Sequence, residues 1–245
     1  MDVDGAGLMP GTWPTTVAEA TAEQARLGPL VVDEGAVPTP LRTVAGLDVS
    51  YAVGSDRLAA AVVVLSAGDL SPVASATVAG RAAFGYVPGL LAFREVPALL
   101  AALRQLDAAP DVLVCDGYGL AHPRGFGLAC HLGVLTGLPT IGVAKTPFVG
   151  HAEPPGPRRG DWSPLMYEGR TVGRVLRTQD GVRPVYVSVG HRLGLAEAAG
   201  LVLSLCPRHR LPETTRRADR LSRDVLAEAG GSATTTTPGP AGLPD

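Results

Sequence analysis

The amino-acid sequence predicts an α/β fold in three layers, α/β/α, around a mixed central sheet. Three strand-like segments come first and are separated by short loops, which is typical of an antiparallel meander. Two later apolar runs, Val112–Cys115 and Thr140–Ala144, are brief, rich in β-branched residues and bounded by Gly or Pro. Such runs are typical of buried parallel strands. We therefore expect strands 1–3 to form the meander and strands 4–5 to run parallel.

Local signals place the first elements. A helix over Val17–Leu27 is indicated by its ends, since Thr16 and Glu19 have capping-box spacing and Gly28-Pro29 is a stop signal. The apolar stripe of this helix is shallow, so we expect it to pack at the edge of the core. The three meander strands are expected over Thr43–Tyr51, Leu58–Leu65 and Pro72–Val78.

Helical spacing of apolar residues predicts a second helix over Leu90–Leu106. Because proline prefers the first turn of a helix, Pro97 indicates that the regular part begins near Glu95. A right-handed crossover through a helix over Phe126–Leu135 should join the two parallel strands. Gly150–Pro164 is expected to be a loop. The later elements are predicted as strands over Thr171–Arg177 and Val185–Val189 and helices over Leu195–Leu205 and Thr214–Glu228.

Length and composition favour one domain. The chain has 245 residues, of which 46% are apolar, enough for a sizeable core. We expect a flexible N-terminus over residues 1–14, a single folded domain over 15–228 and a disordered tail over 229–245. The tail is built almost entirely of Gly, Thr, Pro and Ala and has few large apolar residues.

The sequence contains no apolar run of about 20 residues and no basic start followed by an apolar stretch. It also holds three scattered cysteines without metal spacing, which favours reduced, packed thiols. We therefore expect a cytoplasmic protein without a membrane partner. A monomer is expected as well.

Charge is unevenly distributed along the chain. Residues 1–154 contain eight basic and fourteen acidic residues, whereas residues 155–225 contain thirteen arginines and seven acids. This pattern is compatible with an acidic metal site beside a basic phosphate-binding face, although a solvated arginine-rich surface is an equally common interpretation. Lys145 is the only lysine in the chain. Its compact ammonium group has a tunable pKa, which favours a functional role.

Three acids stand where apolar segments rarely tolerate charge. Asp48 interrupts a strand, Glu95 borders an apolar helix face, and Asp116 ends a buried strand beside the one that ends at Lys145. Each acid alone has an ordinary interpretation, such as an ion pair, exposure to solvent or a turn. Together they favour a site for a hard divalent cation, Mg²⁺ or Mn²⁺, because the predicted topology brings them to one edge of the sheet.

This order of elements and acids resembles the ribonuclease H-like nuclease architecture. Four segments narrow the resemblance to the endonuclease V family: Val-Ala-Gly-Leu-Asp48-Val-Ser-Tyr, Gly-Tyr86-Val-Pro-Gly-Leu-Leu-Ala-Phe-Arg-Glu95, Asp116-Gly-Tyr-Gly-Leu-Ala-His122-Pro-Arg-Gly and Thr-Ile-Gly-Val-Ala-Lys145. Two further segments, Val-Ser-Val-Gly-His191-Arg and Leu-Pro-Glu-Thr-Thr-Arg-Arg-Ala-Asp219, extend it, so that it covers roughly Val17–Leu226.

The resemblance implies a Mg²⁺-dependent DNA repair endonuclease. Its substrate is DNA that contains deoxyinosine, cut at the second phosphodiester bond on the 3′ side of the lesion. The acids that match Asp48, Glu95 and Asp116 hold the metal ion in that family, and Mn²⁺ is expected to substitute. Lys145 matches a residue beside the scissile phosphate, where it can stabilise developing charge.

The resemblance carries Asp219 over as a fourth catalytic residue near the metal. In the family this position holds an aspartate or a histidine. The alternative for Asp219 is an ordinary ion pair on the helix surface, with Arg223 or Arg216.

The resemblance also assigns the substrate-binding residues. Tyr86-Val87-Pro88 matches a wedge that fills the space left when hypoxanthine is lifted from the stack. His122 and Arg124 would contact the substrate backbone. The positions that match the wall of the inosine pocket are Gly89, Leu91, Gly117, Gly119, Gly142 and Ala144.

Two departures from the family pattern predict an altered rate or substrate range. Gly85 stands where the family usually has proline, and Tyr118 stands where it usually has histidine. Two other functions stay open. One is an inosine-specific ribonuclease of the same fold that acts on single-stranded RNA. The other is a nucleic-acid-binding module without catalysis, against which the three acids and the single lysine argue.

Overall fold

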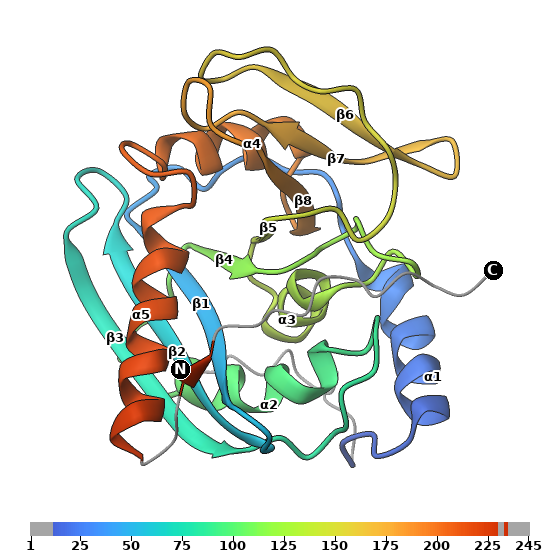
Figure 1. The fold of residues 1–245 in the computed structure, drawn as a ribbon, viewed down its shortest axis with the longest axis vertical. Coiled ribbons are helices and arrows are strands. Elements are labelled where there is room, and N and C mark those ends of the chain that lie inside the picture. Colours follow the sequence, from blue (N-terminus) through green and yellow to red (C-terminus); the bar gives the residue numbers. More distant parts are fainter. Residues whose placement is uncertain (1–11, 230–232, 235–245) are drawn as a thin grey trace.

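The computed structural model describes residues 12–229 and 233–234. Within them, one sheet holds nine strands, in the order β3-β2-β1-β4-β5-β8-β7-β6, with β9 paired to β1 (Figure 1). The strands are β1 (Thr43–Ala52), β2 (Arg57–Ser66), β3 (Pro72–Arg81), β4 (Val112–Asp116), β5 (Thr140–Ala144), β6 (Trp162–Tyr167), β7 (Arg170–Leu176), β8 (Val185–His191) and β9 (Ala233–Thr234). The helices are α1 (Val17–Leu27), the short 3₁₀ helix η1 (Gly28–Leu30), α2 (Ala92–Leu103), α3 (Leu128–Thr136), α4 (Leu195–Ser204) and α5 (Glu213–Glu228).

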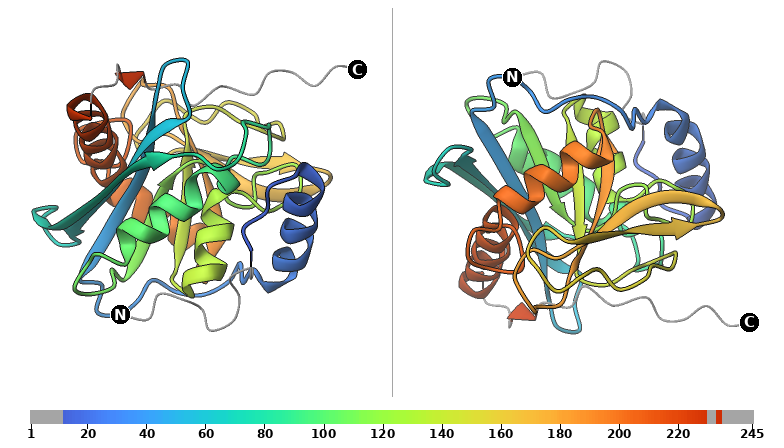
Figure 2. Two further views of the ribbon diagram at one scale, coloured as in Figure 1. Left: turned by 90° about the horizontal axis from the view of Figure 1, so that it is seen from below. Right: turned by 90° about the horizontal axis from the view of Figure 1, so that it is seen from above.

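Strand directions follow the prediction. The meander β1-β2-β3 is antiparallel, and β1, β4 and β5 are parallel to one another. Helices α2 and α3 pack on one face of the sheet and α4 and α5 on the other, so the fold has three layers (Figures 1 and 2). The predicted α/β/α class with a mixed central sheet is therefore confirmed. In the described part of the chain, no helix combines the length and apolar character that crossing a membrane requires.

A side chain of the N-terminal segment hydrogen-bonds to a carbonyl of α2 that a proline leaves without its helical donor. The predicted start of this helix near Glu95 is wrong, because α2 begins at Ala92 and holds Pro97 in its interior. Proline has no N–H, so it leaves the carbonyl four residues earlier, that of Phe93, without its helical partner. The indole Nε1 of Trp13 donates to this carbonyl at 2.9 Å. Trp13 belongs to the segment of residues 1–14 that is predicted to be flexible, and residues 1–11 of that segment lie outside the described part.

Two strands were not predicted. The expected loop Gly150–Pro164 overlaps the start of β6, which pairs with β7 at the edge of the sheet. The short strand β9 lies inside the predicted disordered tail and pairs with Tyr51 and Ala52 of β1. The rest of that tail, from residue 230 onward, lies outside the described residues.

Helix α5 lies directly on β1 because Gly46 has no side chain. A Cβ at Gly46 would stand 2.1 Å from the carbonyl carbon of Thr214 in α5, a distance that real contacts do not allow. Side chains alternate along a strand, so Asp48 points to the same face as Gly46. The glycine thus lets the first turn of α5 lie on β1, and Ser222 in the middle of the helix reaches Asp48.

Candidate active site

Three acids from separate elements meet beside α5. Asp48 and Asp116 are neighbours, because β1 and β4 are parallel and their register pairs Leu47 with Cys115. Glu95 enters from the first turn of α2 and is 6% exposed. The three carboxylates are close enough for their charges to act on one another, as the sequence predicts.

Burial and like charge both oppose ionisation in this cluster. Burial, followed by the charge of Asp116, raises the pKa of Asp48 from its ordinary 3.8 to about 7. Burial, followed by the charge of Asp48, raises the pKa of Glu95 well above its ordinary value. The folded chain therefore holds negative charge here at a free-energy cost.

Each acid has a protein donor of its own. The Ser222 hydroxyl donates to Asp48 Oδ2 at 2.7 Å, and the Tyr51 hydroxyl donates to Glu95 Oε1 at 3.2 Å. Lys145 follows β5, and its Nζ lies 2.7 Å from Asp116 Oδ2. The predicted side-by-side placement of Asp116 and Lys145 is confirmed.

Lys145 keeps its charge because of its carboxylate neighbours. Burial alone would lower its pKa, but the charge of Asp116, with smaller contributions from Asp48 and Asp219, raises it. The Lys145 side chain is 37% exposed. Part of this side chain therefore faces solvent beside the acids.

Asp219 on α5 forms an ion pair on the helix and also lies close enough to Asp48 for its charge to act on that carboxyl group. Its Oδ1 accepts from Arg223 Nη2 at 2.8 Å, whereas Arg216 pairs with Glu213. Its charge also contributes to the raised pKa of Asp48. The helix ion pair therefore does not remove Asp219 from the acidic cluster.

The donor set suits a hard cation, but the acids do not form a closed cage. Within the described residues, no three His, Cys, Asp or Glu side chains form a group placed to hold a metal ion. Carboxylates that raise one another's pKa are nonetheless the oxygen ligands that Mg²⁺ and Mn²⁺ prefer, and a divalent cation would relieve their repulsion. The metal site stays a prediction.

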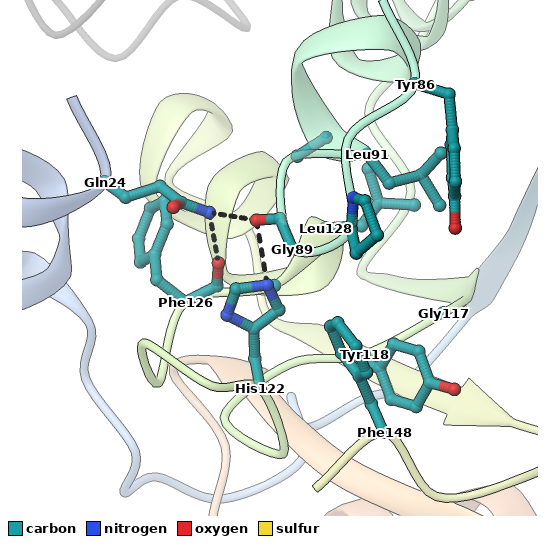
Figure 3. Close-up of a pocket in the computed structure, with 13 residues that line it drawn as sticks. Gln24, Tyr86, Gly89, Leu91, Gly117, Tyr118, His122, Phe126, Leu128 and Phe148 are labelled. Carbon is teal, nitrogen blue, oxygen red and sulfur yellow. Dashed lines mark hydrogen bonds between the residues drawn. The ribbon is translucent and has the colours of Figure 1, made fainter. Parts of the chain in front are cut away.

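A largely apolar pocket adjoins the acids (Figure 3). Gly117, next to Asp116, and Ala92, one turn before Glu95, both lie in its wall. Figure 3 shows Tyr118 and Phe148 on one side and Tyr86 and Leu91 on the other. The Tyr118 and Phe148 rings are 5.2 Å apart, and the Tyr118 hydroxyl donates to the carbonyl of Thr146 at 3.2 Å. Tyr118 and Phe148 thus form one aromatic wall of the pocket.

Comparison with known proteins decides the family. The family model described as Endonuclease V matches residues 26–220. The endonuclease V of Streptomyces coelicolor is 56% identical over 222 residues, which span 90% of this chain and 95% of that protein. The chain belongs to the endonuclease V family.

Solved structures of endonuclease V share the fold. The crystal structure of the Streptomyces avermitilis endonuclease V has a TM-score of 0.87 and 55% identity, with 91% of this chain and 98% of that chain covered. The endonuclease V of Ciona intestinalis was solved in complex with a 24mer DNA containing an inosine followed by a ribo-adenosine. It has a TM-score of 0.77 and 27% identity, with 87% and 98% covered.

The pocket contains about half of the residues predicted to bind DNA or inosine. The residues from that set in its wall are Tyr86, Pro88, Gly89, Leu91, Gly117 and His122. Tyr86 is 45% exposed in this wall, and its role as a wedge stays a prediction. Of the two departures from the family pattern, Tyr118 lies in the wall and Gly85 does not.

Five predicted residues lie outside the pocket wall. Val87 packs against the aromatic cluster around Phe93. Ala144 is buried in β5, and Arg124 is exposed and donates from Nη2 to the carbonyl of Gly89 at 2.7 Å. Gly119 and Gly142 support the pocket from behind. A Cβ at Gly142 would stand 2.6 Å from the backbone nitrogen of Gly119, so the two glycines let the loop after β4 lie on the sheet.

His122 is held by hydrogen bonds within the protein. Burial, followed by the charge of Arg124, lowers its pKa to about 4. Its Nδ1 accepts from the backbone N–H of Arg124 at 3.2 Å, so the proton lies on Nε2, which donates to the carbonyl of Gly89 at 3.0 Å. His122 is therefore a neutral donor within the protein, and its contact to the substrate backbone stays a prediction.

Sequence reasoning missed several residues of the endonuclease V site. Gln24 of α1 lies in the pocket wall, and Ser222 and Tyr51 bond to the acids. A signal for Ser222 was present, since small and hydroxyl residues recur at helical spacing along α5 and face β1. Gln24 had no such signal, because its partners lie more than 60 residues away in the chain.

Proposed function

We propose that this protein is a Mg²⁺-dependent endonuclease that cuts DNA at the second phosphodiester bond on the 3′ side of deoxyinosine, as a DNA repair enzyme. The observation that carries the proposal is the apolar pocket beside the buried Glu95 and the half-buried Asp48 and Asp116. Membership of the endonuclease V family and the inosine-containing DNA in the Ciona intestinalis complex support it. A cytoplasmic monomer is the expected state.

The three acids are the residues that would hold the metal. Asp48, Glu95 and Asp116 supply carboxylate oxygens, and Mn²⁺ is expected to replace Mg²⁺. A divalent ion bound there would lower the pKa of a water molecule and offset the negative charge of the phosphodiester. Ser222 and Tyr51 orient two of the carboxylates by donating hydrogen bonds to them.

Lys145 and Asp219 act at the edge of this cluster. The exposed part of the Lys145 ammonium donates to the scissile phosphate and stabilises charge that develops on its oxygens. Asp219 adds negative charge beside Asp48, which strengthens the preference of the site for a divalent cation. The pair between Lys145 and Asp116 keeps both side chains at the carboxyl edge of the sheet.

The pocket receives the extruded base. Tyr86 fills the vacated stack, and the rings of Tyr118 and Phe148 cover one side of the base. Because the walls of the pocket are largely apolar, an extruded base is a more favourable occupant than water. Backbone groups of Gly89 and Gly117 border the same space and can contact the edge of the base.

An inosine-specific ribonuclease is the second candidate. The Ciona intestinalis complex supports this candidate, because the inosine in its DNA is followed by a ribonucleotide, a ribo-adenosine. Such an enzyme would use the same acids and pocket but would prefer the 2′-hydroxyl.

A nicking assay tests the proposal. Matched strands that differ only in one deoxyinosine, adenine or riboinosine are incubated with the protein in Mg²⁺, Mn²⁺ or EDTA. We expect the deoxyinosine strand to be cut at the second phosphodiester bond on the 3′ side of the deoxyinosine. This cutting should occur with Mg²⁺ or Mn²⁺ and not with EDTA. Faster cutting of the riboinosine strand would select the ribonuclease. Inosine-dependent binding without cutting would select the binding module, and cutting in EDTA would overturn the metal mechanism.

A further inference from the structure

Gln24 lies outside residues 26–220, which the family model matches, yet its side chain reaches the pocket. It is 2% exposed and lies on α1, at the opposite side of the pocket from Tyr86 (Figure 3). No charged group of the acidic cluster contacts it. Its role therefore has to follow from its own hydrogen bonds.

All the hydrogen-bonding groups of the Gln24 amide are engaged. Its Nε2 donates to the carbonyls of Gly89 at 3.0 Å and of Phe126 at 3.1 Å, and its Oε1 accepts from Arg124 Nε. These partners belong to the loop before α2 and the loop before α3. One side chain thus joins two loops that both contribute residues to the pocket wall.

The carbonyl of Gly89 is the point where these bonds meet. Besides Gln24, it accepts from His122 Nε2 at 3.0 Å and from Arg124 Nη2 at 2.7 Å. Gly89 has a φ of +79°, a conformation that other residues rarely adopt, so its carbonyl direction depends on both the glycine and its donors. Tyr86 stands three residues earlier in the same loop. The carbonyl on which these three donors meet therefore lies in the loop that carries Tyr86.

We propose that Gln24 is a positioning residue for the loop of residues 84–91 and for the pocket that this loop borders. By holding the Gly89 carbonyl from behind, it keeps Tyr86 and the pocket in the arrangement that accepts an extruded purine. The functional part of this inference rests on the proposed inosine-directed activity. The positioning part does not, because it concerns the protein alone.

Packing of α1 does not by itself require an amide at this position. Leu27 and Ala20 on the same helix are 0% exposed and already attach it to the core. A buried amide destabilises a protein relative to an apolar side chain unless its hydrogen bonds are made. The two carbonyls that Gln24 satisfies both belong to pocket residues, which places its function there.

Gln24→Glu is the sharpest test. Glutamate has the same size and still accepts from Arg124, but it cannot donate to Gly89 or Phe126 and puts an oxygen against each carbonyl. Loss of two hydrogen bonds predicts hydrogen exchange in residues 84–91 that is faster by about tenfold or more. The KM for the deoxyinosine strand should rise by a similar factor, while kcat changes less than about twofold. Gln24→Met, which removes every bond at similar volume, should reproduce both effects.

Thr16→Ala is the matched control. It removes the capping box of α1, in which the Thr16 hydroxyl accepts from Glu19, and touches no pocket residue. It should lower the midpoint of thermal unfolding without changing exchange in residues 84–91 or the KM. If Thr16→Ala matches the Gln24 variants in both readouts, Gln24 merely docks the helix and the proposal is wrong.

The two parts fail separately. Unchanged exchange in residues 84–91 for both Gln24 variants overturns the positioning proposal, whatever the activity. If the wild-type protein shows no preference for the deoxyinosine strand, the proposed function fails, and the exchange result still decides the role of Gln24. Faster exchange with an unchanged KM on an active enzyme would refute the link to substrate binding.

Discussion

Asp48→Asn is expected to stabilise the metal-free protein and to abolish its activity. The pKa of Asp48 rises from its ordinary 3.8 to about 7 on folding, through burial and then the charge of Asp116. At about 1.36 kcal/mol for each pKa unit, this corresponds to an upper limit of about 4 kcal/mol. Asparagine cannot ionise, yet it keeps an oxygen that accepts from the Ser222 hydroxyl.

The sign of the pH dependence follows from the raised pKa. Because the folded protein holds the Asp48 proton more tightly than the unfolded chain, this contribution to stability is fully present below pH 3.8. It is lost as the pH rises through about 7. Roughly 3 kcal/mol of the loss should fall between pH 5 and pH 9. The raised pKa of Glu95 acts in the same direction.

Denaturant unfolding of both proteins in EDTA at pH 5 and pH 9 measures this effect. The stability difference between Asp48→Asn and the wild type should increase by roughly 3 kcal/mol from pH 5 to pH 9. Added Mg²⁺ should stabilise the wild type at pH 9 more than the variant, since a bound ion stabilises only the state that holds it. An unchanged difference across this range would refute the claim that ionised Asp48 is costly in the folded protein.

Three other changes test separate parts of the structure. Lys145→Met should lower single-turnover cleavage of the deoxyinosine strand by about 10²-fold; a decrease below threefold would exclude Lys145 from the reaction. Trp13→Phe should lower the free energy of unfolding by about 1–2 kcal/mol in urea titrations, because it leaves the Phe93 carbonyl unpaired; no measurable change would contradict that. Tyr86→Ala should leave stability within about 0.5 kcal/mol but weaken deoxyinosine-strand binding about tenfold, and equal affinity would argue against a wedge.

The sequence was sufficient to predict the positions of those candidate site residues that lie at the ends of neighbouring strands. Asp48 and Asp116 could be placed together because both end or interrupt apolar runs, and parallel strands bring their carboxyl ends to one edge. Lys145 followed from the same rule, and its ion pair with Asp116 confirms the placement. Periodicity and strand topology are local or nearly local properties, so a single sequence can express them.

Residues of the pocket were predicted less well than the acids. A glycine or a basic side chain can support the pocket through contacts within the protein without lining the space where a base would bind. Gly119 and Gly142 are needed where loop and sheet touch, not where a base would lie. Arg124 and His122 could be recognised as members of a motif, but motif membership does not say whether a side chain points outward. Both donate to the Gly89 carbonyl, a partner more than 30 residues earlier in the chain, but His122 is buried and Arg124 is exposed.

Pro97 shows most clearly why single-sequence reasoning fails at long range. A proline at the sixth position of α2 is unfavourable on local grounds alone, since it removes one helical hydrogen bond, and the sequence therefore favoured a later helix start. The freed Phe93 carbonyl instead accepts from Trp13, 80 residues away, whose ring also stacks on His131 at 5.6 Å. Any compensation of this kind requires the folded arrangement. The same holds for Gln24, whose two carbonyl partners come together only after α1 has packed beside the pocket.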